Sequence, residues 1–274
     1  MQMGEEKIFS LEEYARESAI FTMAKRYKSN SQNITKQMQM KIRKILLAMV
    51  LLSAALGVRA QQPQGTWSVI PKAGVALANL SGAKLYYSDG GGFMESKGKY
   101  NSRFVGGVEV EWQGLPTTSI SLGALYAQQG CRYRDFEASD YQSVGIGYGR
   151  LRQKMDYLCV PLMVNQYLVE GFAVKAGVQM GFLCNSKVSM ATTEITHHSD
   201  GAKEYGETVR SNNDDMDMRR KVDVAIPVGL SYEYLNVVLE VRYVLGLIQT
   251  YKDKAMPSEK NRAFYITAGY KFNL

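Results

Sequence analysis

The sequence predicts an all-β protein that folds as a closed antiparallel up-and-down β-barrel of about eight strands. Apolar and polar residues alternate with a period of two in repeated segments, such as Gly171 to Cys184, and this period is typical of strands with two different faces. Short and long connections alternate between the segments, as expected for strands that run up and down around a barrel. Glycine recurs on the polar face, where small residues fit the crowded concave side of a small barrel.

A leader precedes the predicted barrel domain, which spans residues 61–274. Lys41–Lys44 (KIRK) is a basic n-region, Ile45–Val58 is an apolar h-region, and small residues surround Ala60, so residues 40–60 are predicted to be a secretory signal peptide. The apolar run is shorter than the roughly 20 residues of a membrane-spanning helix, which disfavours an anchor. We expect residues 1–39 to be a mis-assigned start or a dispensable extension, disordered or weakly helical.

The first four strands are predicted near residues 67–78, 103–112, 118–131 and 152–165. In the second strand, Val108 and Val110 share one face, and Glu109 shares the other face with further polar or small residues. The third strand alternates in the same way, with Leu122 on its apolar face. The fourth is the least regular, because its polar face carries Cys159 and other apolar residues.

The last four strands are predicted near residues 171–184, 219–233, 236–247 and 262–273. In the fifth strand every second residue is apolar, while Lys175 and Gln179 lie on the other face. In the seventh, Val241 lies on the apolar face, and Glu240 and Arg242 lie on the polar one. The eighth strand places apolar residues such as Phe264, Ile266 and Tyr270 on one face and Thr267, Gly269 and Lys271 on the other.

Two kinds of connection join these strands. Three are tight turns, at residues 113–117, 166–170 and 234–235. The others are long, polar and glycine-rich, and we expect them to be loops crowded at the opposite end of the barrel: residues 80–102, 132–150, 185–218 and 248–261. This asymmetry is the loop pattern of outer-membrane barrels.

The apolar face is predicted to point outward to lipid and the polar face into the lumen, because charges on the polar face nearly balance and unpaired buried charge is unfavourable. In the opposite orientation, Lys175 and Arg242 would each meet lipid at a cost of roughly 2–4 kcal/mol. The predicted lumen-facing charged network is Lys72, Glu109, Glu111, Lys175, Lys221, Asp223, Glu240 and Arg242. The predicted lipid-facing residues are Phe172, Val174, Val178, Phe182, Val224, Ile226, Leu239, Val241, Phe264 and Ile266.

The formal net charge of +7 does not indicate a nucleic-acid partner. The chain has 33 Lys and Arg against 26 Asp and Glu, but ten of these basic residues and five of the acidic ones lie in residues 1–60. The excess within the barrel domain is therefore only two charges, and no binding to nucleic acid is expected.

No catalytic site, metal site or cofactor is predicted. His197 and His198 lie in a polar segment and are expected to be solvated, because adjacent side chains rarely converge on one ion. A pairing of His197 with Asp200 leaves a surface protease as an alternative of another class. The cysteines are irregularly spaced and odd in number, so we expect unpaired thiols rather than a disulfide framework at Cys131, Cys159 and Cys184.

Several short motifs occur in an order that resembles the PorT-like outer-membrane β-barrel proteins, often labelled porin family proteins. The longest are LYAQQG at Leu125–Gly130 and YLCVPL at Tyr157–Leu162, in which Cys159 stands where the family often has an acid. The others are Lys72-Ala73-Gly74, Gly106-Gly107, Arg242-Tyr243, Gly246-Leu247, Asn261 and Gly269–Phe272. The resemblance covers about residues 67–274. It implies periplasmic termini and a C-terminal aromatic strand that the barrel-assembly machinery recognises.

Together these features predict an integral protein of the outer membrane of a Gram-negative cell, exported by a signal peptide cleaved near Ala60 and surrounded by outer-membrane lipids. Eight strands enclose an interior that side chains can fill. We therefore expect a largely filled lumen and no enzymatic activity. The role is assigned to the surface loops, chiefly 185–218, in docking a protein partner or supporting an envelope or secretion complex. A small passive solute pore is the alternative, and a soluble-type ligand-binding barrel is another.

Overall fold

The computed structural model describes residues 63–274, except 89–91, 140–143, 199 and 254. The whole described fold lies in one compact unit, Val58–Leu274. The predicted extension at 1–39 and signal peptide at 40–60 lie outside the described residues.

The described residues form strands, apart from one turn of 3₁₀-helix, η1 (Met216–Met218), and irregular connections. No helix in this part of the chain has the length and apolar content needed to cross a membrane. The strands are β1 (Trp67–Ser81), β2 (Lys84–Ser88), β3 (Phe93–Lys97), β4 (Asn101–Leu115), β5 (Thr118–Arg132), β6 (Phe136–Ser139), β7 (Val144–Val169), β8 (Phe172–His197), β9 (Lys203–Asp214), β10 (Val222–Tyr234), β11 (Val237–Gly246), β12 (Lys260–Tyr270) and β13 (Phe272–Asn273).

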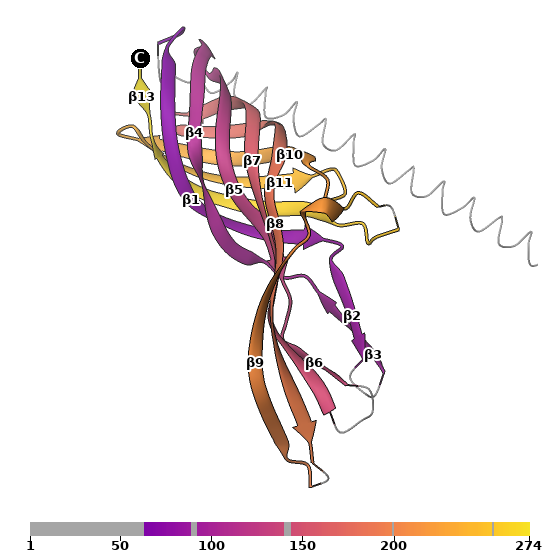
Figure 1. The fold of residues 1–274 in the computed structure, drawn as a ribbon. Coiled ribbons are helices and arrows are strands. Elements are labelled where there is room, and N and C mark those ends of the chain that lie inside the picture. Colours follow the sequence, from indigo (N-terminus) through magenta and orange to yellow (C-terminus); the bar gives the residue numbers. More distant parts are fainter. Residues whose placement is uncertain (1–62, 89–91, 140–143, 199, 254) are drawn as a thin grey trace, which may run out of the picture. The chain divides into compact units, whose positions relative to one another are not determined.

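Eight of these strands close into an antiparallel ring, in which each strand is hydrogen-bonded to two neighbours (Figure 1). The order around the ring is β1-β4-β5-β7-β8-β10-β11-β12, and β12 pairs again with β1. The short strand β13 continues along β1 beyond the end of β12. The prediction of a closed up-and-down barrel of about eight strands is therefore confirmed. Closure leaves no unpaired strand edge within the ring.

Tight turns join ring strands at one end of the barrel. The turn between β10 and β11 holds Leu235 and Asn236 at φ values of 49° and 65°. Positive φ at both central residues is the geometry whose twist matches that of the adjoining strands. Between β7 and β8, Gly171 adopts a φ of 79°, which costs glycine little because it has no Cβ. The chain ends at this same end, where the Leu274 N–H donates to the Trp67 carbonyl at 2.8 Å.

At the opposite end, β7 and β8 continue past the barrel as a projecting sheet. In the ring, β7 pairs with β5 as far as Arg152 and β8 pairs with β10 as far as Phe182. The two strands stay paired with each other beyond these points, out to Val144 and Thr196. Strand β6 adds to the outer part of β7, and β9 adds to the outer part of β8. We call this four-stranded extension the arm (the described residues of 136–151 and 188–214; Figure 1).

The prediction that residues 132–150 and 185–218 are loops was wrong, because most of both segments is strand. Strand β9 is exposed or half-buried at every position. It therefore lacks the apolar face that reveals a strand in a sequence. Residues 80–102, also expected to be a loop, contain the separate hairpin of β2 and β3.

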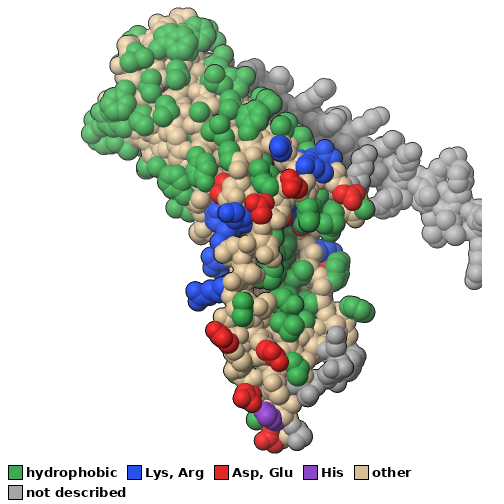
Figure 2. All heavy atoms as spheres, in the orientation of Figure 1, with side chains coloured by type: hydrophobic (Ala, Val, Ile, Leu, Met, Phe, Trp, Pro, Cys, Tyr) green, Lys and Arg blue, Asp and Glu red, His purple; other side chains and the backbone are tan. Residues whose placement is uncertain are grey.

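The outer wall of the ring is apolar, and the charged side chains lie inside. Val178 and Leu239 expose 55% and 56% of their surface, whereas Glu109 and Arg242 expose 0% and 1%. Figure 2 shows hydrophobic side chains over the visible side of the barrel. Aromatic pairs border this wall at both ends, with ring centroids 6.2 Å apart for Trp67–Trp112 and 4.6 Å apart for Tyr243–Phe264. Such girdles are typical of barrels that cross a membrane.

Candidate functional site

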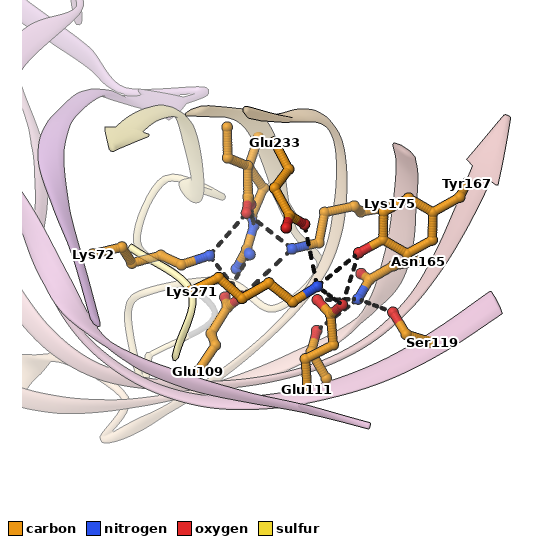
Figure 3. A network of polar contacts seen from close by, with 12 residues as sticks. Lys72, Glu109, Glu111, Ser119, Asn165, Tyr167, Lys175, Glu233 and Lys271 are labelled. Atoms are coloured by element: carbon orange, nitrogen blue, oxygen red, sulfur yellow. Dashed lines mark hydrogen bonds and ion pairs between the residues drawn. The ribbon is translucent and has the colours of Figure 1, made fainter. Parts of the chain in front are cut away.

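Five interlocked charged side chains occupy the lumen. Glu109 on β4 accepts hydrogen bonds from Lys72 Nζ on β1 at 2.6 Å and from Arg242 Nη2 on β11 at 2.6 Å, and Lys175 Nζ on β8 lies 3.5 Å from it. Glu240, also on β11, accepts from Lys72 and Lys175 at 2.9 and 3.0 Å and from Arg242 Nε. Each carboxylate therefore contacts all three cations. Figure 3 shows Lys72, Lys175 and Glu109 of this cluster pointing toward one another inside the barrel.

A second cluster lies beside the first and is centred on Lys271, which follows β12. Its Nζ donates to Glu111 Oε1 at 2.9 Å and to Glu233 Oε2 at 3.2 Å (Figure 3). The Tyr167 hydroxyl donates to Glu111 Oε1 at 2.7 Å, and Asn165 Nδ2 donates to Glu111 Oε2 at 3.1 Å. The carboxylate of Glu111 is thus held by hydrogen bonds on both of its oxygens.

The two clusters, which we call the plug, carry no net formal charge. Its members are four cations, Lys72, Lys175, Arg242 and Lys271, and four carboxylates, Glu109, Glu111, Glu233 and Glu240. Side-chain exposures within the plug run from 0 to 9%. Charges this deeply desolvated are tolerated only when each is paired and hydrogen-bonded. Each of the eight charged groups of the plug has an ion-pair partner, although Arg242 Nη1 has no hydrogen-bond partner among the described residues.

A third polar cluster lies at the mouth of the barrel on the side of the arm. The Arg219 guanidinium donates to Asp215 at 2.9 Å and to Glu259 at 3.0 Å, and it lies over the Tyr251 ring at 3.7 Å. Burial raises the pKa of the Glu259 carboxyl, and the Arg219 charge opposes that shift. Between this cluster and the plug lies a layer of buried side chains that includes Tyr157, Tyr265, Leu125, Met155 and Cys159.

All of the predicted lumen residues except Lys221 lie inside the barrel in this structure. Asp223 is buried there but lies outside the plug, and its carboxylate accepts a hydrogen bond from Asn261 Nδ2 at 2.9 Å. Lys221 requires a correction, because its side chain is exposed. Strand β10 begins only at Val222, so the strand alternation does not extend to Lys221. The predicted lipid-facing residues are all exposed or half-buried on the outer wall.

Sequence reasoning missed several residues of these clusters. Lys271 and Glu233 continue the polar alternation of their strands, so extending the pattern to the last residues would have found them. Arg219 and Glu259 lie outside the ring strands, where no periodicity marks a buried position. Asn165 and Tyr167 carry no formal charge, and a search for balanced charges passes over them.

The histidines lie on the arm rather than in the lumen. The His197 ring contacts the Glu137 carboxylate, which also accepts a hydrogen bond from Lys203 Nζ at 2.8 Å. The Lys203 ammonium holds the pKa of Glu137 below its ordinary value, and His197 adds to this effect. Asp200 accepts a hydrogen bond from the Ala202 N–H at 2.9 Å. Within the described residues, no hydrogen bond joins His197 to Asp200, and no group of three or more His, Cys, Asp or Glu is placed to hold a metal ion.

Cys131, Cys159 and Cys184 are unpaired thiols.

A comparison with family models agrees with this architecture. The sequence model of the family described as "Outer membrane protein beta-barrel domain" matches residues 59–252. No curated protein is significantly similar in sequence. Solved structures similar to this chain include the attachment invasion locus protein Ail of Yersinia pestis, at 15% identity and a TM-score of 0.33, with 76% of this chain and 100% of that chain covered. Neisserial surface protein A follows at 14% identity and a TM-score of 0.31, with 76% and 97% covered. The N-terminal barrel domain of OprF from Pseudomonas aeruginosa has 11% identity and a TM-score of 0.26, with 77% and 100% covered. No function is carried over from these structures.

Proposed function

The chain belongs to the outer membrane protein beta-barrel domain family, and from this premise we propose that it is a non-enzymatic integral protein of the outer membrane that works through its arm. One observation carries the proposal, namely the polarity of the ring. Apolar side chains such as Val178, Leu239 and Ile266 are about half exposed on the outer wall, while charged side chains are buried inside. A water-soluble domain has the reverse arrangement, whereas lipid around the ring satisfies this one.

The plug supports a closed lumen rather than a passage for solutes. Its eight charged side chains form two neighbouring hydrogen-bonded clusters that together carry no net charge, and the Tyr157–Tyr265 layer lies between them and the Arg219 cluster. A passive pore of this size would need an aqueous path along its axis, with charged groups exposed to water. Exposures of at most 9% in the plug favour the closed form over the alternative of a small solute pore.

The arm is the part of the described chain best suited to docking a protein. It projects from the ring on two long strands, and its outermost strand β9 has a free edge, because among the described strands β9 pairs only with β8. A free strand edge presents unpaired backbone groups to a partner. We assign the docking role to this sheet, in place of the flexible loop expected at 185–218.

Two measurements test the proposal. The purified chain is expected to leave native membranes only in detergent and, in planar bilayers, to show no steady openings. A variant with Lys72→Ser, Glu109→Ser, Glu240→Ser and Arg242→Ser is expected to conduct, because it removes four long side chains that cross the lumen and leaves the remaining charges of the plug in balance. Steady large openings of the unchanged protein would favour the pore, and a folded monomer in plain buffer would contradict membrane insertion.

The more specific resemblance to PorT-like proteins belongs to the same proposal. LYAQQG ends at Gly130 in β5, where φ is 116°, and YLCVPL lies within β7. Exposed Tyr270 and Phe272 at the end of the chain suit recognition by the barrel-assembly machinery. N-terminal sequencing of the mature protein from the outer membrane tests the export step. A first residue near Gln61 is expected, and an intact N-terminus would contradict cleavage near Ala60.

A further inference from the structure

A groove at the root of the arm is surrounded by basic side chains. It has a volume of 330 Å³, and four of its lining residues are Arg150, Arg152, Lys154 and Arg210. No acidic residue lines it; the remaining lining residues are Ser189, Met190, Ala191 and Asn212. Within the described residues none of the four cations forms an ion pair, in contrast to every cation of the plug.

A β-bulge turns two of these cations toward the groove. The register of β7 against β8 shifts between Gly149 and Arg152, and Arg150 adopts a φ of 54°. A positive φ is strained for a residue with a Cβ, and here the Arg150 N–H is held by Asp135 Oδ1 at 2.9 Å. Leu151 is buried, while Arg150 and Arg152 on either side of it are exposed. Bulges commonly re-aim side chains in this way.

The groove lies on the side of β7 that continues the outer wall of the barrel. Gln153 and Met155 are buried, and Gln153 Nε2 donates to Asp215 inside the mouth at 2.9 Å, so Lys154 and Arg152 point outward. Lys154 is four residues from Leu158, the exposed apolar residue of β7 nearest the arm. Four residues span about 13 Å along a strand, or about 10 Å along the axis of a barrel with tilted strands.

This height places the cations where lipid headgroups meet the protein. The headgroup region extends roughly 5–8 Å beyond the hydrocarbon core on each side, and long basic side chains reach further. Lys187 pairs directly with Lys154 in register and adds another exposed cation at the same level. Figure 2 shows Lys and Arg side chains, with Asp and Glu among them, where the hydrophobic surface of the barrel gives way to the arm.

We propose that this groove binds phosphate groups carried on the headgroups of outer-leaflet lipids. Two arginines offer the forked donors that match phosphate oxygens, and Lys154 and Arg210 add charge around the same volume. Lipid is the source of the phosphate because the groove adjoins the wall that lipid covers. The inference rests on the membrane-spanning orientation proposed above, and it adds a ligand that the closed barrel and the docking arm do not require.

The test counts bound lipid in nanodiscs. The unchanged protein is inserted into phosphatidylcholine nanodiscs that contain a small fraction of diphosphoryl lipid A, and native mass spectrometry counts the lipid A retained on the released protein. Retention is expected to fall by about tenfold or more in Arg152→Gln/Lys154→Gln. The control Lys221→Gln/Lys252→Gln removes two exposed cations away from the groove and is expected to retain lipid A like the unchanged protein.

Three results would overturn the inference while leaving the proposed function intact. Equal retention by Arg152→Gln/Lys154→Gln would exclude the groove, and equal losses in both double variants would show diffuse charge attraction only. Binding of a soluble sulfated oligosaccharide that depends on Arg152 and Lys154, without any preference for lipid A, would assign the groove to a soluble polyanion. Heat-modifiable electrophoretic mobility checks that each variant is folded. Failure of the unchanged protein to insert into a bilayer would instead overturn the proposed function, and this inference with it.

Discussion

Glu109 is fully buried, yet three cations within hydrogen-bonding or ion-pair distance surround its carboxylate. Removal of one charged residue from such a set leaves its partners buried without a compensating charge. The resulting loss of folding free energy is larger than the net stabilisation that the whole set provides. The lumen therefore depends on completeness of the plug rather than on the strength of any one ion pair.

Glu109→Gln tests this dependence. The neutral amide would leave Lys72, Lys175 and Arg242 to share Glu240 alone, and we expect the free energy of unfolding to fall by about 3–5 kcal/mol. Urea unfolding in liposomes, followed by the fluorescence of Trp67 and Trp112, measures the change. Glu207→Gln on the exposed strand β9 is the matched control and should stay within about 0.5 kcal/mol of the unchanged protein. Similar stabilities for the two variants would mean that the plug is not essential.

The Glu137 carboxylate near the tip of the arm allows a prediction about pH. Its pKa lies below the ordinary value mainly because Lys203 donates a hydrogen bond to it. The pairing is therefore complete above the ordinary pKa of a glutamate and is lost as the pH falls through the lowered one. In Lys203→Gln the pKa of Glu137 should rise toward its ordinary value, as measured by carboxyl ¹³C NMR titration. Lys84→Gln, which removes the equivalent partner of Glu95, should leave Glu137 unchanged.

Prediction of single residues from the sequence succeeded where the strand period and the need for charge balance indicated the same face. It failed where only one of these two applied. For Glu240 and Arg242, both the strand period and the need for charge balance indicated the same face. Lys221 is an even number of residues from Asp223 and so falls on the polar face by alternation. It lies in a bend before β10, however, and side chains alternate between two faces only within a strand. The pairing of Lys271 with both Glu111 and Glu233 joins residues far apart in the sequence, and only the closed ring brings them together.

At the scale of strands, the barrel and the arm differ in what their sequences reveal. Ring strands have an apolar outer face and an inner face that is mostly polar, so apolar and polar residues alternate along most of them. The outer part of β7, with Gly145, Gly147 and Gly149, and the exposed strand β9 have no such contrast. Their strand character comes from pairing with a neighbour, which is a tertiary property that local periodicity does not record.

The ring glycines make a prediction about how closely the strands pack. A Cβ added at Gly177 on β8 would lie 2.0 Å from the Leu162 carbonyl oxygen on β7, so Gly177→Ala forces the two backbones apart. We expect a loss of about 1–3 kcal/mol in the free energy of unfolding. Gly149→Ala on the arm is the control, because there a Cβ meets nothing closer than 3.9 Å. Equal effects of the two substitutions in urea unfolding would show that the close approach at Gly177 is not limiting.

At the scale of the whole described unit, one pair of strands serves two structures. The inner parts of β7 and β8 complete the ring, and their outer parts carry β6 and β9. The ring pairings of β7 lie at Arg152 and beyond toward the turn, and those of β8 lie at Phe182 and before. Neither set includes the outer arm. The division predicts that folding of the barrel does not require the outer arm, while docking does.

A variant with a shortened arm tests that division. Phe136 lies opposite Tyr148, and Thr192 lies opposite Val209, so residues 137–147 and 193–208 can each be replaced by an Asn-Gly turn, which suits a two-residue hairpin. The variant keeps the basic groove and every ring pairing. We expect it to insert into liposomes and to show the same heat-modifiable mobility as the unchanged protein, because its buried plug and apolar wall are intact.

The same variant should lose the protein partners that the full-length arm captures. Both proteins are extracted from native outer membranes by affinity purification, and the partners are identified by mass spectrometry. A protein that co-purifies with the unchanged chain but not with the shortened one is the expected outcome, since only the exposed sheet differs between the two. Identical partners for both would move docking from the arm to the barrel or its remaining loops. Failure of the shortened chain to insert would show instead that the outer arm takes part in folding of the ring.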